Sequence, residues 1–115
     1  MPIAAKYLFM VSMDVAPEKE ALFNEIYDEH VDFIKAVPGV RGVTRWKTQP
    51  AAFVIAGEIK PIDGSGMARY TALYELDDPA ILTSKAWSEA SEKGRWAAEI
   101  RPHTFNRSHV VRKAV

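Results

Sequence analysis

The pattern of apolar side chains between positions 7 and 15 predicts a strand. The residues of one face would be Tyr7, Phe9, Val11, Met13 and Val15. Successive side chains of a strand point to opposite sides, and here Leu8 and Met10 make part of the second face apolar as well. A strand of this kind belongs inside a sheet that is covered on both sides.

A helical period follows the break at Ala16-Pro17. Apolar residues there recur at steps of four, three, four and three, which is typical of an amphipathic helix. The residues of this stripe are Phe23, Tyr27, His30, Ile34 and Val37. Pro38 and Gly39 are expected to end the helix. The stripe places the imidazole of His30 among apolar groups that face the rest of the protein, where its ionisation can be tuned near neutral pH.

Three more strands are expected at 40–48, 69–76 and 105–115, and Ser84 is expected to cap a second helix. The stretch 49–68 is compatible with two structures. A loop of this length is uncommon in a compact domain and often acts as a lid over a ligand. An extended hairpin is the alternative.

The expected elements follow the order β-α-β-β-α-β, which predicts an α+β domain of the ferredoxin-like type. Such a domain has a four-stranded antiparallel sheet with helices on one face only. Trp46, Tyr70 and Tyr74 are expected on the uncovered face. Because a monomer rarely leaves so large an apolar patch in water, we expect a symmetric homodimer that pairs the two sheet faces.

Length and composition limit the kinds of protein that this chain can be. A chain of 115 residues fits one domain, spanning residues 1–115. Lys plus Arg and Asp plus Glu number 15 each, so no attraction to nucleic acid is expected. No apolar run approaches the ~20 residues that cross a bilayer, and no signal peptide is recognised, so we expect a cytoplasmic protein without membrane contact. Without cysteine there is no disulfide, thiolate nucleophile or zinc–thiolate site.

The run Tyr27-Asp28-Glu29-His30, in a helix that ends at Val37-Pro38-Gly39, resembles the EthD-like group of dimeric α/β-barrel proteins. The segment 72–79 and Arg101-Pro102-His103 are similar to other segments of that group. The resemblance implies a ferredoxin-like dimeric α/β barrel. The wider superfamily includes cofactor-free monooxygenases, polyketide cyclases, muconolactone isomerases and haem-degrading enzymes, so the resemblance does not select a reaction.

His30 is the main candidate for chemistry. An imidazole at the inner surface can act as a general base or hold a substrate oxygen by a hydrogen bond. The resemblance implies a similar place, since this histidine tends to lie at the rim of the barrel cavity in the family. The alternative is a histidine that only packs, with its nitrogens bonded to the backbone or to Tyr27.

Aromatic side chains supply the other candidates. The candidates for polarising a substrate oxygen are Tyr7 and Tyr74. The candidates for lining the pocket of a flat ligand are Tyr27, Trp46 and Tyr70. The substrate would lie between the sheet and the first helix, under the 49–68 segment. The alternative is that these aromatic groups form the core of the dimer.

No metal or cofactor is expected. The three histidines, His30, His103 and His109, are far apart in the sequence and give no local zinc or iron signature. The sequence holds no nucleophilic serine motif, phosphate-binding glycine loop or dinucleotide fingerprint. Haem ligation by His30 is left as an alternative because some members of the resembling superfamily bind haem, although no second ligand stands out.

Three functions are compatible with these observations. The first is a small cofactor-independent enzyme acting on a hydrophobic, aromatic or polyketide-like molecule. His30 would move a proton at a carbon next to a carbonyl, as an isomerase, cyclase, lyase or monooxygenase requires. The second is a dimer that binds a small molecule in the same cavity without turnover. The third is a purely structural assembly whose aromatic face leaves no open cavity.

Overall fold

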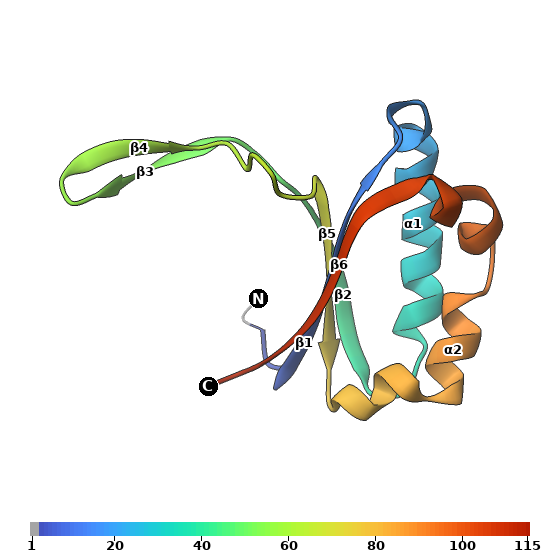
Figure 1. Ribbon diagram of the computed structural model, residues 1–115. Helices are drawn as coiled ribbons and strands as arrows, with labels where there is room; N and C mark the ends of the chain where they lie inside the picture. The colour runs from blue at the N-terminus through green and yellow to red at the C-terminus, as the bar shows by residue number, and fades with distance from the viewer. Residues whose placement is uncertain (1–2) are drawn as a thin grey trace.

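The structure, a computed structural model, describes residues 3–115 (Figure 1). The strands are β1 (Tyr7–Val15), β2 (Val40–Lys47), β3 (Ala51–Ile55), β4 (Glu58–Ile62), β5 (Tyr70–Leu76) and β6 (Thr104–Lys113). The two α-helices are α1 (Glu20–Lys35) and α2 (Lys85–Ser91). Short helical turns are η1 (Pro17–Lys19), η2 (Pro79–Thr83), η3 (Trp96–Ile100) and η4 (Arg101–His103).

Four strands form one antiparallel sheet in the order β2-β5-β1-β6. Both helices lie on the same side of this sheet (Figure 1). The element order, with β3 and β4 inserted between β2 and β5, confirms the predicted ferredoxin-like βαββαβ arrangement. None of the helices within residues 3–115 has the length and apolar character that a membrane crossing requires.

The apolar stripe of α1 packs on the sheet and forms the core. The largest side chains that are fully buried are Phe23, Ile26, Ile34, Leu76 and Ile100. Three of them come from α1, which is the helix whose period was read from the sequence. Burying side chains of this size stabilises the fold by roughly 1.5–3 kcal/mol each.

Tyr70 and Tyr74 face α1, so their expected place on the uncovered face is wrong. Their exposed fractions are 7% and 2%, and the hydroxyl of Tyr74 lies 3.0 Å from that of Tyr27. The reason is the alternation of side chains along β5, because Leu76, at the same parity, is needed in the core. Trp46 does lie on the uncovered face, where it is 58% exposed.

The 49–68 stretch is an extended hairpin, and the alternative of a lid is wrong. Strands β3 and β4 pair with each other and not with the main sheet. Figure 1 shows the hairpin projecting from the side of the sheet opposite the helices. It therefore cannot cover a ligand bound between the sheet and α1. The large apolar side chains exposed on β3 and β4 are Phe53, Val54, Ile55, Ile59 and Ile62, at 46–76%.

Helix α2 begins and ends where local chemistry predicts. The Ser84 hydroxyl accepts a hydrogen bond from the backbone N–H of Trp87 at 3.1 Å, which confirms the expected cap. Gly94, just beyond the helix, has a φ of +74°, and a Cβ there would lie 2.4 Å from Oε1 of Glu29. Only glycine allows both this backbone conformation and this close approach to α1.

We expect Ser84→Ala to lower the free energy of unfolding by about 1 kcal/mol, because an N–H at the start of α2 loses its partner. Ser88→Ala is the matched control, since its side chain is exposed and makes no hydrogen bond within residues 3–115. Alanine favours helices over serine, so this variant should be neutral or slightly more stable. Urea denaturation at one fixed protein concentration measures both. Equal losses in the two variants would contradict the capping role.

Candidate functional site

A cavity of about 220 Å³ lies between the sheet and the helices. Strands β1, β5 and β6 supply one wall, and α1, α2 and the turns 96–103 supply the other. Its aromatic lining residues are Phe9, Tyr27, Tyr74, Trp87 and Trp96. Its polar and charged lining residues are His30, Ser91, Arg101, Arg107 and His109. The cavity therefore combines flat apolar walls with groups that can exchange protons or hold charge.

His30 lies at this cavity in an aromatic setting. Its side chain is 7% exposed and stacks on Trp96, with ring centroids 5.0 Å apart and an interplanar angle of 25°. Tyr27 meets the imidazole edge-on at 5.6 Å. The Nδ1 atom is buried and has no hydrogen-bond partner within residues 3–115. Buried polar atoms are normally paired, so this orphaned nitrogen sets His30 apart from a histidine that only packs.

The pKa of His30 is lowered from 6.5 to about 4, and burial is the main cause. The positive charge of Arg101 acts in the same direction, while the negative charge of Glu92 acts in the opposite direction. Low-dielectric surroundings disfavour the charged imidazolium relative to the neutral ring. At neutral pH the imidazole is therefore uncharged and is able to accept a proton.

The hydroxyl groups of Tyr27 and Tyr74 form a buried pair, 3.0 Å apart. Burial is the main cause that raises the pKa of both phenols, and that of Tyr74 rises well above its ordinary value. Both hydroxyls therefore keep their hydrogens at neutral pH. Within such a pair one hydroxyl donates to the other, and the second hydrogen remains available for a ligand oxygen.

The structure brings three of the six predicted site residues to the cavity: His30, Tyr27 and Tyr74. Tyr7 packs against the core elsewhere on the helix-covered face, with the ammonium of Lys113 5.9 Å from its ring. Trp46 lies on the opposite face of the sheet, where its indole N–H donates to the Thr44 hydroxyl at 2.9 Å. One continuous pocket lined by all six aromatic and imidazole groups is therefore not formed.

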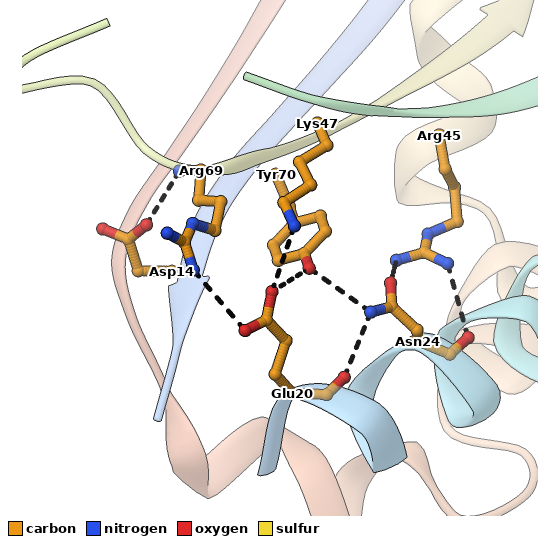
Figure 2. Close-up of polar contacts among 7 residues, drawn as sticks. All are labelled: Asp14, Glu20, Asn24, Arg45, Lys47, Arg69 and Tyr70. Atoms are coloured by element: carbon orange, nitrogen blue, oxygen red, sulfur yellow. Dashed lines mark hydrogen bonds and ion pairs between the residues drawn. The ribbon is translucent and has the colours of Figure 1, made fainter. Parts of the chain in front are cut away.

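Tyr70 belongs to a polar network at the start of α1 (Figure 2). Its hydroxyl donates to the carboxylate of Glu20, and the Asn24 amide donates to that hydroxyl at 3.3 Å. Lys47 and Arg69 also approach Glu20, at 3.6 Å and 3.5 Å. The hydrogen bond from Tyr70 is the main cause that lowers the pKa of Glu20. This hydroxyl is used to tie α1 to the sheet.

Sequence reasoning missed several groups that line the cavity: Trp87, Trp96, Arg101, Arg107 and His109. They come from α2, from the turns after it and from β6, so no local spacing joins them to His30. One signal was available for His109: in a strand, residues two positions apart point to the same face, and His109 lies two positions after Arg107. The structure places it beside Phe9, with ring centroids 5.9 Å apart and an angle of 25°.

The turn that carries Trp96 is fixed to α1 by an ion pair. Arg95 donates from Nε and Nη2 to Oε2 of Glu29, at 3.1 Å and 3.0 Å. Its backbone N–H also donates to Oε1 of the same carboxylate at 3.2 Å. These bonds lower the pKa of Glu29. Because Glu29 and His30 are neighbours in α1, the same contact holds Trp96 over the imidazole.

A second cavity, about 400 Å³, lies on the uncovered face near the base of the hairpin. Its walls include the hydroxyl groups of Ser12, Thr71 and Ser108, and none of its lining residues is ionisable. Acid–base chemistry is therefore favoured at the His30 cavity, although that cavity is smaller. Within residues 3–115, no group of His, Asp and Glu side chains is arranged to hold a metal ion.

Several solved structures are similar to this chain. MhuD, a heme degrader from Mycobacterium tuberculosis with two hemes in its active site, is 13% identical with a TM-score of 0.59, covering 95% of each chain. An antibiotic biosynthesis monooxygenase is 14% identical with a TM-score of 0.61, covering 95% of this chain and 98% of that one. An EthD family protein from Bacillus halodurans is 12% identical with a TM-score of 0.57, covering 95% and 99%.

The chain has a ferredoxin-like fold. The EthD family protein among its structural neighbours agrees with the resemblance read from the sequence. No protein-family model and no curated protein matches the sequence. At identities of 12–14% the likeness establishes the fold alone, so the chemistry has to be argued from the cavity.

The lowered pKa of His30 predicts a stability that depends on pH. As pH falls through 6.5 the unfolded chain takes up a proton that the folded chain refuses until about pH 4. Stability is therefore lost as pH falls through this window, by about 2 kcal/mol between pH 7 and pH 5. Three carboxyl groups also have a lowered pKa, but even their ordinary pKa values lie below this pH interval. They are Glu20 (4.5), Glu29 (4.5) and Asp63 (3.8).

Urea unfolding of the wild type and His30→Gln at pH 7 and pH 5 measures this effect. Glutamine does not titrate, so the variant should lose much less stability than the wild type over the same interval. If His30→Gln loses as much as the wild type, the burial of a neutral imidazole is not the cause.

Proposed function

We propose that this protein is a small enzyme that moves a proton with His30. The substrate would be a compact hydrophobic molecule, aromatic or polyketide-like, with an acidic C–H next to a carbonyl. The observation that carries the proposal is the buried imidazole of His30, which lines an aromatic cavity and whose Nδ1 has no hydrogen-bond partner within residues 3–115. A histidine with a purely structural role would have its nitrogens paired.

The electrostatics of the cavity support this chemistry. Proton transfer from a C–H group of the substrate to neutral His30 creates an imidazolium and an enolate side by side. Burial disfavours a lone imidazolium, as the lowered pKa of His30 indicates, but the adjacent enolate charge offsets that cost. The Tyr27–Tyr74 pair can donate its free hydrogen to the enolate oxygen. Tyr7 lies outside the cavity, so Tyr74 takes the role of polarising the carbonyl.

The size of the cavity limits the ligand. Pockets that hold drug-sized molecules have volumes of roughly 300–1,000 Å³, while this one has about 220 Å³. A ligand of one or two fused rings suits it. The proposal needs no haem: Trp96 stacks on the imidazole, and a porphyrin is much larger than a cavity of about 220 Å³. The proposed chemistry uses only the side chains of this chain.

A binding protein without turnover is the second candidate. The observation that favours it is the pKa of His30, about 4, which makes the imidazole a weak base unless the substrate supplies a compensating charge. Such a protein would bind the same ligands in the same cavity. The two functions differ in whether a bound molecule loses a proton.

Deuterium exchange distinguishes the two candidates whatever reaction follows. We expect the protein in D2O to accelerate exchange at the carbon next to the carbonyl in a panel of small aromatic ketones and diketones, followed by NMR. His30→Gln should reduce the rate by about 10²–10⁴-fold, the usual contribution of a general base. His103→Gln is the control, because His103 does not line the cavity. Binding without exchange would support the binding protein, and equal exchange in wild type and His30→Gln would remove His30 from the mechanism.

We also infer that two copies pair through their uncovered sheet faces. Leu73, Met10 and Val110 stand side by side across β5, β1 and β6 on that face. Trp46 and the apolar hairpin are exposed on the same side of the sheet. An isolated two-stranded hairpin is at best marginally stable in water. A second copy would cover both the face and the hairpin, which accounts for β1 being apolar on both sides.

Sedimentation equilibrium tests the dimer. We expect the wild type to sediment as a dimer, and Trp46→Ala or the double variant Val54→Ser/Ile59→Ser to raise the dissociation constant at least tenfold, since central apolar anchors are worth roughly 1–2 kcal/mol or more. Trp87→Ala removes the same kind of side chain from the other face and should leave the constant unchanged. A wild-type protein that stays monomeric at high micromolar concentration contradicts the inference.

A further inference from the structure

The His30 cavity has an uneven charge. The whole chain is balanced, with 15 basic and 15 acidic residues. The groups that line the cavity nevertheless include two arginines, two histidines and no carboxylate. A site whose only fixed charges are positive attracts and holds anions. The cavity therefore favours a ligand that carries negative charge.

The two arginines differ in their partners. Nη2 of Arg101 donates to Oε1 of Glu92 at 2.9 Å, so its charge is partly compensated. No ion pair or hydrogen bond of the Arg107 side chain is found within residues 3–115. Arg107 is thus the lining cation that is available for a ligand.

A bulge in β6 turns Arg107 toward the cavity. Phe105 pairs with Asp14 and Ser108 pairs with Ser12, so β6 holds one residue more than β1 over this interval. In a regular strand, Thr104 and Arg107 would point to opposite faces, because they are three positions apart. With it, Thr104 is buried and Arg107 lines the cavity on the same face. Bulges commonly re-aim a side chain next to a functional site.

Asn106 maintains this bulge. Its φ of +53° lies in the left-handed region, which asparagine tolerates better than most residues. Its side-chain amide donates to Oδ2 of Asp14 at 3.0 Å, and Oδ1 of Asp14 accepts from the backbone N–H of Arg69 at 2.7 Å. One carboxylate on β1 therefore holds the bulge and the entry to β5 together.

We propose that the ligand of this cavity is an aromatic carboxylate, and that the guanidinium of Arg107 binds its carboxylate group. The inference rests on the proposed function, since it names the substrate class of the same site. The planar guanidinium matches a carboxylate with two parallel hydrogen bonds, whereas a neutral amide offers it a single weaker acceptor. The ring of the ligand would lie against Phe9 and Trp87, with its reactive carbon toward His30.

Binding of 2-naphthoate and 2-naphthamide at pH 7, measured by calorimetry, tests the proposal. The two molecules have nearly the same shape and differ in charge. We expect the wild type to bind the naphthoate at least tenfold more tightly. Arg107→Gln should abolish that preference while still binding the naphthamide. Arg112→Gln is the matched control, because Arg112 lies on the same strand, opposite Leu8 on the other face, and should keep the preference.

Three results would overturn the proposal: no binding of naphthoate to the wild type, equal binding of the two ligands, or a preference that survives in Arg107→Gln. His30→Gln separates this outcome from that of the proposed function, since it should lose deuterium exchange yet keep the preference for naphthoate. If exchange depends on His30 but the protein shows no preference for the carboxylate, the proposed function stands and the proposed ligand class is wrong. If the protein prefers the carboxylate but catalyses no exchange that depends on His30, the ligand class stands and the proposed function is wrong.

Discussion

The packing of α1 on one face of the sheet is the contact on which the other features depend. Phe23, Ile26 and Ile34 are fully buried in it, and the loss of water from such surface is the main force that holds a domain together. Polar contacts fix the helix at two places, through Glu20 near its start and through Glu29 in its second half. Once the helix is set, each strand has an inner face and an outer face.

The same burial gives His30 its chemical character. The imidazole occupies a position on the apolar stripe that a leucine could fill, and it remains uncharged because its surroundings solvate charge poorly. Stability and reactivity are therefore linked at one residue. In the proposed mechanism, a base that resists protonation in the empty site would become effective when a substrate develops negative charge beside it. The arginines of the cavity would stabilise that charge as well.

The two faces of the sheet carry different properties. The inner face holds the cavity, its titratable groups and the aromatic walls. The central part of the outer face is apolar or hydroxyl-bearing, charged side chains such as Arg112 lie nearer the strand ends, and the hairpin extends from that side (Figure 1). This separation follows from the period of a strand, which gives successive residues to opposite faces. It would allow β1 and β6 to contribute to the proposed site with one set of side chains and to the proposed dimer surface with the other.

Sequence alone determined the features that depend on neighbouring residues. The period of α1 placed His30 on the buried stripe, Ser84 identified the start of α2, and the order of elements indicated the ferredoxin-like fold. Tertiary structure decided which face of β5 the helix covers, and for this reason the prediction from sequence put Tyr70 and Tyr74 on the wrong face. Only the tertiary structure shows that Arg107 and His30 line the same cavity. The physical reason is that a strand's pattern fits either face until packing selects one. A one-residue bulge, such as that at Asn106, shifts the alternation without a mark in the hydrophobic period.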